Sequence, residues 1–223
     1  MCGICGFLAA RIDADAAAVL GRMTQRLRHR GPDGIGTWLD PAAGIALGHT
    51  RLAVLDPSAA GRQPMASADG RWVISYNGEI YNAPELRRHL PDAGRTLRGH
   101  SDTEVLLETI AKLGVERTLD RAEGMFAFAL WDRQNRTLTL ARDRLGKKPL
   151  YYGRFGGGLL FASELKALHA HPLFAPEIDR DALAGFLRDG WLAGPRSIYR
   201  GVFKLPPASR LTVRADDDSL AEP

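Results

Sequence analysis

Long hydrophobic runs, cysteines and an excess of one charge are all scarce in this chain of 223 residues. A membrane-spanning helix needs about 20 consecutive apolar residues, and no such stretch occurs, so we expect no membrane partner. The two cysteines are too few for a disulfide scaffold. The first residues lack the basic segment and long apolar stretch of a secretory signal. Together these absences predict a cytoplasmic, reducing location.

Charge is nearly balanced, with 30 Lys and Arg against 26 Asp and Glu for a net charge of +4. The basic residues are scattered, so we expect no nucleic-acid partner. Their densest group is Arg22, Arg26, Arg28 and Arg30, which we interpret as the solvated face of a helix and its exit. The 45% hydrophobic and 25% charged residues are typical of a globular domain with a sizeable core.

Strand and helix patterns occupy separate stretches of the chain instead of alternating. A glycine-punctuated apolar segment predicts a buried strand from Gly3 to Ala9, and Asp13 or Asp15 can cap the helix that follows. Two hairpins are expected further on, with their strands at 125–131 with 136–141 and at 150–154 with 159–162. This arrangement predicts an α+β fold with antiparallel sheets.

Three further helix starts carry capping residues. Ser101 and Glu104 form the S/T-x-x-E pattern of a capping box before an apolar run. Ser163 is expected to cap a short helix, and Asp179 or Asp181 to cap the next one.

Cys2 stands directly behind the initiator methionine. Methionine aminopeptidase removes Met1 when the next side chain is small, and this would leave a thiol and a free α-amine on one residue. Their unperturbed pKa values are about 8.5 and about 7.7–8.0, so the amine can act as base for its own thiol. Cys2 and Cys5 also form a C-x-x-C pair typical of redox or metal sites. The six histidines show no spacing that would complete a zinc site, so we expect no metal.

Four polar positions further along have side chains suited to bind a small zwitterion. Arg51 follows an apolar run and could grip a carboxylate, or be an ordinary surface arginine. Asn77-Gly78 could supply an amide and an open N–H to an oxyanion, although this dipeptide is also a strong hairpin signal. Asp102 could bind an ammonium group or cap a helix, and Glu79 could assist it or be an exposed strand residue.

In combination, these residues and their neighbours resemble the glutaminase domain of glutamine-dependent asparagine synthetases. That domain belongs to the class II amidotransferases, within the N-terminal-nucleophile hydrolases. The similarity covers nearly the whole chain, in segments 1–6, 28–33, 49–56, 76–82, 99–104, 123–129, 142–151, 161–166 and 204–207. Segments 142–151 and 161–166 favour this branch over the glucosamine-phosphate synthase and amidophosphoribosyltransferase branches.

The resemblance implies a role for each matching residue. Cys2 would be the nucleophile that hydrolyses the side-chain amide of L-glutamine, with Asn77 and Gly78 as the oxyanion hole. Arg51 would hold the substrate carboxylate, and Asp102 with Glu79 the ammonium. Glutamine would also contact the backbone of Leu52, Ala53, Val54 and Leu55. The fold implied is a four-layer α/β/β/α sandwich of two antiparallel sheets.

The resemblance also implies a domain boundary and a partner. Residues 2–213 would form the glutaminase domain, and 214–223 a truncated linker toward a C-terminal synthetase domain. The phosphate loop of that domain has no counterpart here, so we expect no cofactor in this domain, with ATP and Mg²⁺ confined to the synthetase. There the ammonia would convert aspartate to asparagine. Two alternatives for the function stay open: another nitrogen acceptor and a non-catalytic glutamine-binding module. For the assembly, a homodimer stays open.

Overall fold

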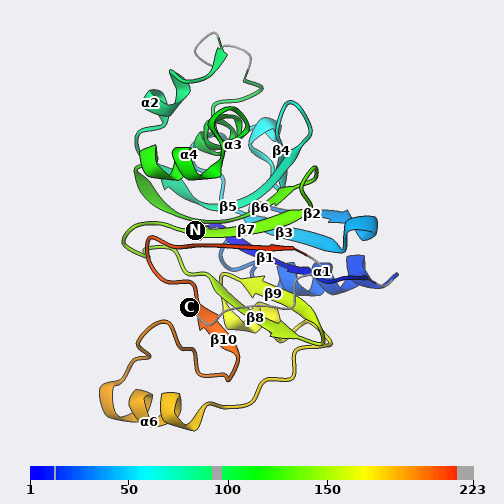
Figure 1. Ribbon diagram of the computed structural model, residues 1–223, viewed down its shortest axis with the longest axis vertical. Helices are drawn as coiled ribbons and strands as arrows, with labels where there is room; N and C mark the ends of the chain where they lie inside the picture. Colours follow the sequence, from blue (N-terminus) through cyan, green and yellow to red (C-terminus); the bar gives the residue numbers. More distant parts are fainter. Residues whose placement is uncertain (13, 92–96, 215–223) are drawn as a thin grey trace.

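Two antiparallel sheets are stacked face to face, and helices cover the outer side of each (Figure 1). The computed structural model describes residues 1–12, 14–91 and 97–214. The predicted α+β fold, a four-layer sandwich with two antiparallel sheets, is confirmed.

The first sheet carries the N-terminal strand at an interior position. Its six strands lie in the order β10-β8-β9-β1-β3-β2. Their bounds are β1 (Gly3–Leu8), β2 (Gly34–Asp40), β3 (Ile45–Arg51), β8 (Tyr151–Phe155), β9 (Gly158–Ala162) and β10 (Val202–Lys204). The register places Gly3 of β1 opposite Thr50 of β3. The start of β1 and the end of β3 therefore lie at the same edge of the sheet.

The second sheet has five strands in the order β11-β7-β6-β5-β4. Their bounds are β4 (Met65–Ala66), β5 (Trp72–Ile80), β6 (Gly124–Asp132), β7 (Thr137–Arg142) and β11 (Arg210–Arg214). β5 pairs with β6 without interruption from Trp72 to Ile80, and Asn77 is opposite Ala127. Asn77-Gly78 thus lies inside a strand, so the hairpin alternative for this dipeptide is wrong. Arg214 ends β11, whereas we assigned it to the linker; the other linker residues, 215–223, lie outside the described residues.

Alternation along the strands divides the apolar side chains among three cores. Ile4 and Leu8 of β1 point between the sheets, where they join Trp131 of β6. Cys5 and Phe7 point to the opposite side, toward helix α1. Because the side-chain period of a strand is two, every second residue of an inner strand faces the other sheet. Cys2, two residues before Ile4, lies on that inner side.

The helices occupy the outer layers. The first sheet is covered by α1 (Ala16–Gln25) and α5 (Leu165–Leu168), and the second by α2 (Ala83–Arg87), α3 (Asp102–Leu113) and α4 (Val115–Arg121). Helix α6 (Arg180–Asp189) lies apart from the sandwich (Figure 1). Two short 3₁₀ turns, η1 (Pro41–Ala43) and η2 (Ala59–Gly61), precede β3 and β4. No described helix is long and apolar enough to cross a membrane.

Two of the predicted helix caps are confirmed and one is wrong. Ser101 caps α3, since its Oγ accepts a hydrogen bond from Glu104 N at 3.2 Å, and Asp179 caps α6 through Asp181 N and Ala182 N. Ser163 does not cap α5, and that prediction is wrong, because its Oγ instead accepts from Ile4 N at 3.0 Å. Asp15 occupies the N-cap position of α1 without a side-chain hydrogen bond, and Asp13 lies outside the described residues.

Candidate active site

A cavity of about 190 Å³ opens where β1 begins, β3 and β5 end and α3 starts. It is several times the roughly 30 Å³ that one water occupies, so it can hold a ligand the size of an amino acid. Every residue predicted from the sequence lines it: Cys2, Arg51, Leu52, Ala53, Val54, Leu55, Asn77, Gly78, Glu79 and Asp102. These residues come from both sheets and from α3, so the stacking of the two sheets brings them together.

Cys2 presents its sulfur to the end of β3. Leu52 N donates to Sγ at 3.4 Å, and Sγ lies 3.7 Å from Leu52 O. Burial raises the pKa of the Cys2 thiol, while the Leu52 hydrogen bond and the charges of Arg51 and Arg30 oppose that rise. The thiol therefore requires a nearby base to react at neutral pH.

Cys5 has a different environment. It is fully buried in the core beneath α1, and burial raises its pKa strongly. Both cysteines are free. Since residues 2 and 5 of an extended segment face opposite ways, their sulfurs do not converge. The described residues also contain no group of three or more His, Cys, Asp or Glu that could hold a metal ion.

Arg51 extends into the cavity from the end of β3. Its guanidinium donates to Ser58 O at 2.9 Å and to Asp56 O. The Asp56 carboxylate in turn accepts from Ser58 N and His100 N, each at 2.9 Å. Two carbonyls thus orient the guanidinium, which has three further N–H donors for a ligand.

Asn77 and Gly78 reach the cavity from β5. Asn77 is 1% exposed, and its Nδ2 has no hydrogen-bond partner in the described structure. A buried amide donor without an acceptor is costly, and such groups are rare. A Cβ on Gly78 would lie 2.5 Å from Met125 O and 2.6 Å from the Phe126 Cβ. Only glycine therefore allows β5 to lie this close to β6 here.

Asp102 is buried at the first turn of α3. Its carboxylate accepts from Tyr76 Oη at 3.0 Å, Ile80 N at 2.8 Å and Thr103 N at 2.9 Å. Burial raises the pKa of Asp102, and these three hydrogen bonds oppose the rise. Glu79 lines the same cavity from β5. Asp102 and Glu79 therefore give the cavity two acidic side chains from α3 and β5, in addition to Arg51 from β3.

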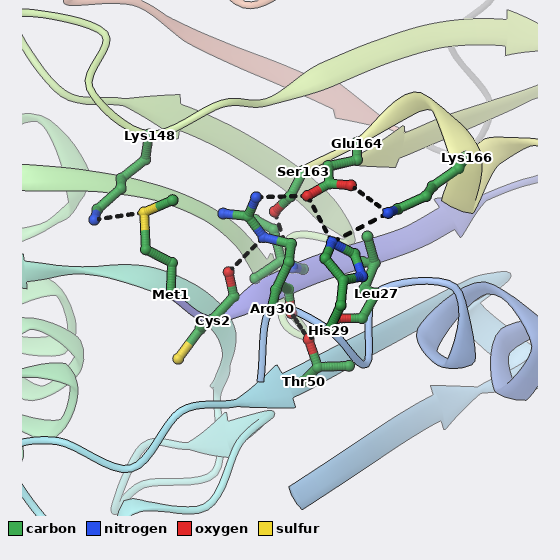
Figure 2. A network of polar contacts seen from close by, with 12 residues as sticks. Met1, Cys2, Leu27, His29, Arg30, Thr50, Lys148, Ser163, Glu164 and Lys166 are labelled. Carbon is green, nitrogen blue, oxygen red and sulfur yellow. Dashed lines mark hydrogen bonds and ion pairs between the residues drawn. The ribbon is translucent and has the colours of Figure 1, made fainter. Parts of the chain in front are cut away.

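Arg30 is a site residue that sequence reasoning missed, and its assignment to a solvated helix face is wrong. Its side chain is 8% exposed, Nε donates to Cys2 O at 2.9 Å, and Nη1 lies 2.7 Å from Glu164 Oε1 (Figure 2). Burial raises the pKa of Glu164, but hydrogen bonds from Arg30, Lys166 and His29 outweigh it and lower the value to about 2. Both segments, 28–33 and 161–166, belong to the resemblance, which was the available signal.

Two more polar side chains hold β5 in place. Gln63 accepts from Tyr76 N at 2.7 Å and donates to Thr103 Oγ1 at 3.3 Å, joining β5 to α3. His49 donates through Nε2 to Tyr76 O at 3.0 Å, joining β3 to β5 across the two sheets. No motif in the sequence pairs these positions, since they meet only through the fold.

Two solved structures share this fold. The chain aligns with glutamine phosphoribosylpyrophosphate amidotransferase from B. subtilis with a TM-score of 0.65 and 20% identity, covering 96% of this chain and 49% of that one. An allosteric regulatory enzyme of purine biosynthesis aligns with a TM-score of 0.68 and 21% identity, covering 95% and 47%. The chain therefore has the same fold as the parts of these two enzymes that it covers.

The sequence relatives specify the family. The chain belongs to the glutamine amidotransferase domain family, which it matches over residues 1–222. It is 39% identical over 220 residues to asparagine synthetase [glutamine-hydrolyzing] 3 of Bacillus subtilis (strain 168), covering 97% of this chain and 35% of that protein. Identity to the putative asparagine synthetase of Mycobacterium tuberculosis (strain ATCC 25618 / H37Rv) is also 39%, with the same coverage. The chain thus spans about a third of the length of these curated relatives.

Proposed function

We propose that this domain hydrolyses the side-chain amide of L-glutamine to glutamate and ammonia through a thioester on Cys2. The observation that supports it is the one cavity in which the Cys2 sulfur, the unpartnered Asn77 amide and the Arg51 guanidinium lie together with the acids Glu79 and Asp102. A nucleophile, an oxyanion donor and clamps for both charged ends of an amino acid are what this reaction needs.

The reaction follows from these groups. Once Met1 has been removed, the Cys2 α-amine takes the thiol proton, and the thiolate attacks the amide carbon of glutamine. The Asn77 side-chain amide and the Gly78 N–H stabilise the oxyanion, a contribution of about 3–4 kcal/mol for such a donor. The α-ammonium gives its proton to the departing ammonia, and water then cleaves the thioester.

Charged side chains of the cavity orient the substrate. Arg51 pairs with the glutamine α-carboxylate, while Asp102 and Glu79 bind the α-ammonium. Leu52, Ala53, Val54 and Leu55 contribute backbone contacts. Tyr76 Oη and Ile80 N both donate to Oδ2 of Asp102. These hydrogen bonds set the orientation of the carboxylate before the substrate binds.

The ammonia then serves a second reaction. We place this chain as the glutaminase domain, residues 2 to about 214, working with a C-terminal synthetase domain that converts aspartate to asparagine with ATP and Mg²⁺. The names and greater length of the relatives support this partner. The glutaminase itself uses no cofactor in this scheme, and we place it in the cytoplasm, where its two free thiols would stay reduced.

The test is glutamate release from glutamine, measured on protein shown by mass spectrometry to begin at Cys2. We expect Cys2→Ala to abolish release, and protein that retains Met1 to be nearly inactive because its amine is acylated. Diazo-oxo-norleucine should label Cys2. Cys5→Ala is the matched control, since Cys5 is buried on the other side of β1, and it should keep activity. A trimmed wild-type protein that binds glutamine but releases no glutamate would instead indicate a binding module.

A further inference from the structure

Lys148 places an ammonium group in the wall of the same cavity without a carboxylate partner. The residue is 6% exposed and lines the cavity with Cys2. Its Nζ donates to Met1 Sδ at 3.3 Å (Figure 2). Among the residues that the structure describes, no carboxylate lies within 4.0 Å of that nitrogen. Buried lysines are normally paired, so this placement needs a reason.

The backbone that carries Lys148 is held firmly. The Asp143 carboxylate, which is 1% exposed, accepts from Lys148 N at 3.1 Å and Lys147 N at 2.9 Å. On the other side, the Arg142 guanidinium donates to Lys148 O at 2.7 Å and to Gly146 O at 2.6 Å. A buried acid and a half-buried arginine therefore fix this turn, so the place from which the Lys148 side chain starts is built into the fold.

Met1 lies between Lys148 and Cys2, as Figure 2 shows. Its peptide bond joins it to Cys2, and its side chain reaches to Nζ. Removing Met1 frees the Cys2 α-amine at one end of that residue and Nζ at the other. From standard bond lengths they are then within about 9 Å of each other. Among the described residues, Met1 Sδ is the only hydrogen-bond acceptor that Nζ contacts.

The other charged groups in the cavity or next to Cys2 already have assigned partners. Arg30 pairs with Glu164 at 2.7 Å. Arg51 is held by the carbonyls of Ser58 and Asp56 and meets the substrate carboxylate in the proposed reaction. The acids that line the cavity are Asp56, which accepts from two backbone N–H groups, and Asp102 and Glu79, which are assigned to the substrate ammonium.

We propose that Lys148 holds the Cys2 α-amine in its neutral, basic form at neutral pH. This inference rests on the proposed function. A fixed positive charge disfavours protonation of a neighbouring amine. At about 9 Å and an effective dielectric constant between about 20 and 80, the amine pKa falls by roughly 0.3 to 1.4 units. That brings an amine of pKa about 7.7–8.0 close to 7, where a general base works best. Lys148 acts through the amine and contacts neither the thiol nor the scissile amide, so it is a positioning residue.

Two variants test the charge separately from the shape. Lys148→Met removes the charge and keeps the length, whereas Lys148→Arg keeps the charge. The measurement is the pH dependence of kcat/KM for glutamine hydrolysis, on protein shown to begin at Cys2. We expect the acidic limb of the Met variant to move up by about 0.3 to 1.4 units, and that of the Arg variant to stay near the wild type. An unmoved acidic limb in folded Lys148→Met would overturn the proposal.

A second measurement does not depend on turnover or on the variants folding. The rate at which acetic anhydride acetylates the wild-type α-amine, followed by peptide mass spectrometry across pH, gives the amine pKa directly. A value clearly below about 7.7 supports the inference, and one at or above the ordinary range overturns it. Failure of the proposed function can be told apart from failure of this inference. In that case, wild-type protein with a free Cys2 amine releases no glutamate at any pH.

Discussion

At the scale of single residues, the unusual feature is a polar atom left without a partner. Asn77 is buried on the inner face of β5, where Ser75, two residues earlier, donates to Gly48 O at 3.0 Å while the Asn77 Nδ2 donates to nothing. An unsatisfied buried donor costs about 1–3 kcal/mol. Sites that must stabilise a developing charge carry such donors in advance, which is the role we propose for this amide.

Asn77→Ala should therefore lower kcat for glutamine hydrolysis by about 10²–10³-fold, since one oxyanion donor is lost. The free energy of unfolding should change by less than about 1 kcal/mol, because an unsatisfied group leaves with the side chain. Steady-state kinetics and urea unfolding measure the two effects.

Ser75→Ala is the matched control on the same face of β5. It removes a hydrogen bond between the sheets, so it should lower stability by about 1 kcal/mol and leave kcat within a few-fold. If both variants lost activity equally, the loss would come from a disturbed strand and not from the amide.

At the scale of elements, the close approach of β5 and β6 depends on glycine. The two strands pair along all of β5, and at Gly78 there is no room for a methyl group against Met125 O and Phe126. In α1, by contrast, Gly21 has nothing within 4 Å of where a Cβ would stand. Sterically, glycine is thus required at position 78 in the strand but not at position 21 in the helix.

Gly78→Ala should lower the free energy of unfolding by about 1–3 kcal/mol, because β5 must move away from β6 to relieve the overlap. Glutamine hydrolysis should fall with it, since the Gly78 N–H moves too. Gly21→Ala is the control, and it should raise stability by about 0.5–1 kcal/mol through helix propensity, with activity unchanged. Thermal and urea unfolding give both values, and a neutral Gly78→Ala would contradict the steric account.

At the scale of the whole molecule, buried titratable groups couple folding to pH. His49 lies between the sheets, and burial lowers its pKa to about 4. The hydrogen bond to Tyr76 O opposes this change but is outweighed. Burial, with a smaller contribution from Arg22, also lowers the pKa of His171 to about 4. The unfolded chain takes up these protons below about pH 6.5, whereas the folded protein takes them up only near pH 4.

The free energy of unfolding should consequently fall as pH drops from about 6.5 to about 4, by on the order of 1–3 kcal/mol for each histidine. Glu164 adds a second loss at lower pH. Its pKa is depressed to about 2, so its stabilisation is present above about pH 4.5 and disappears between about 4.5 and 2. Urea unfolding at a series of pH values measures both.

His171→Gln should flatten the first part of that curve, since one buried titrating group is removed. The exposed His89→Gln is the control and should leave the slope as it is. A wild-type stability that stays constant between pH 6.5 and 4 would contradict this reading of the two buried histidines.

Much of the fold was predictable because its signals are local. Short apolar runs mark β1 and β6, alternating Thr and Leu mark β7, and the caps Ser101 and Asp179 mark two helix starts. Ser163 failed because its position favours a cap locally, yet β1 offers its hydroxyl a backbone N–H from residue 4. Asn77-Gly78 was ambiguous for the same reason, since a turn signal says nothing about a partner strand 50 residues away.

The sequence by itself determined the order of strands and helices, the resemblance to a glutaminase and the identities of the residues proposed to act on glutamine. These are properties of short segments, which need no knowledge of what lies across the sheet. The tertiary structure alone decided that Arg30 is buried against the Cys2 carbonyl, that the Asn77 amide has no acceptor and that Lys148 lines the same cavity as Cys2. Such facts depend on distances between segments far apart in the chain, which arise only when the two sheets stack.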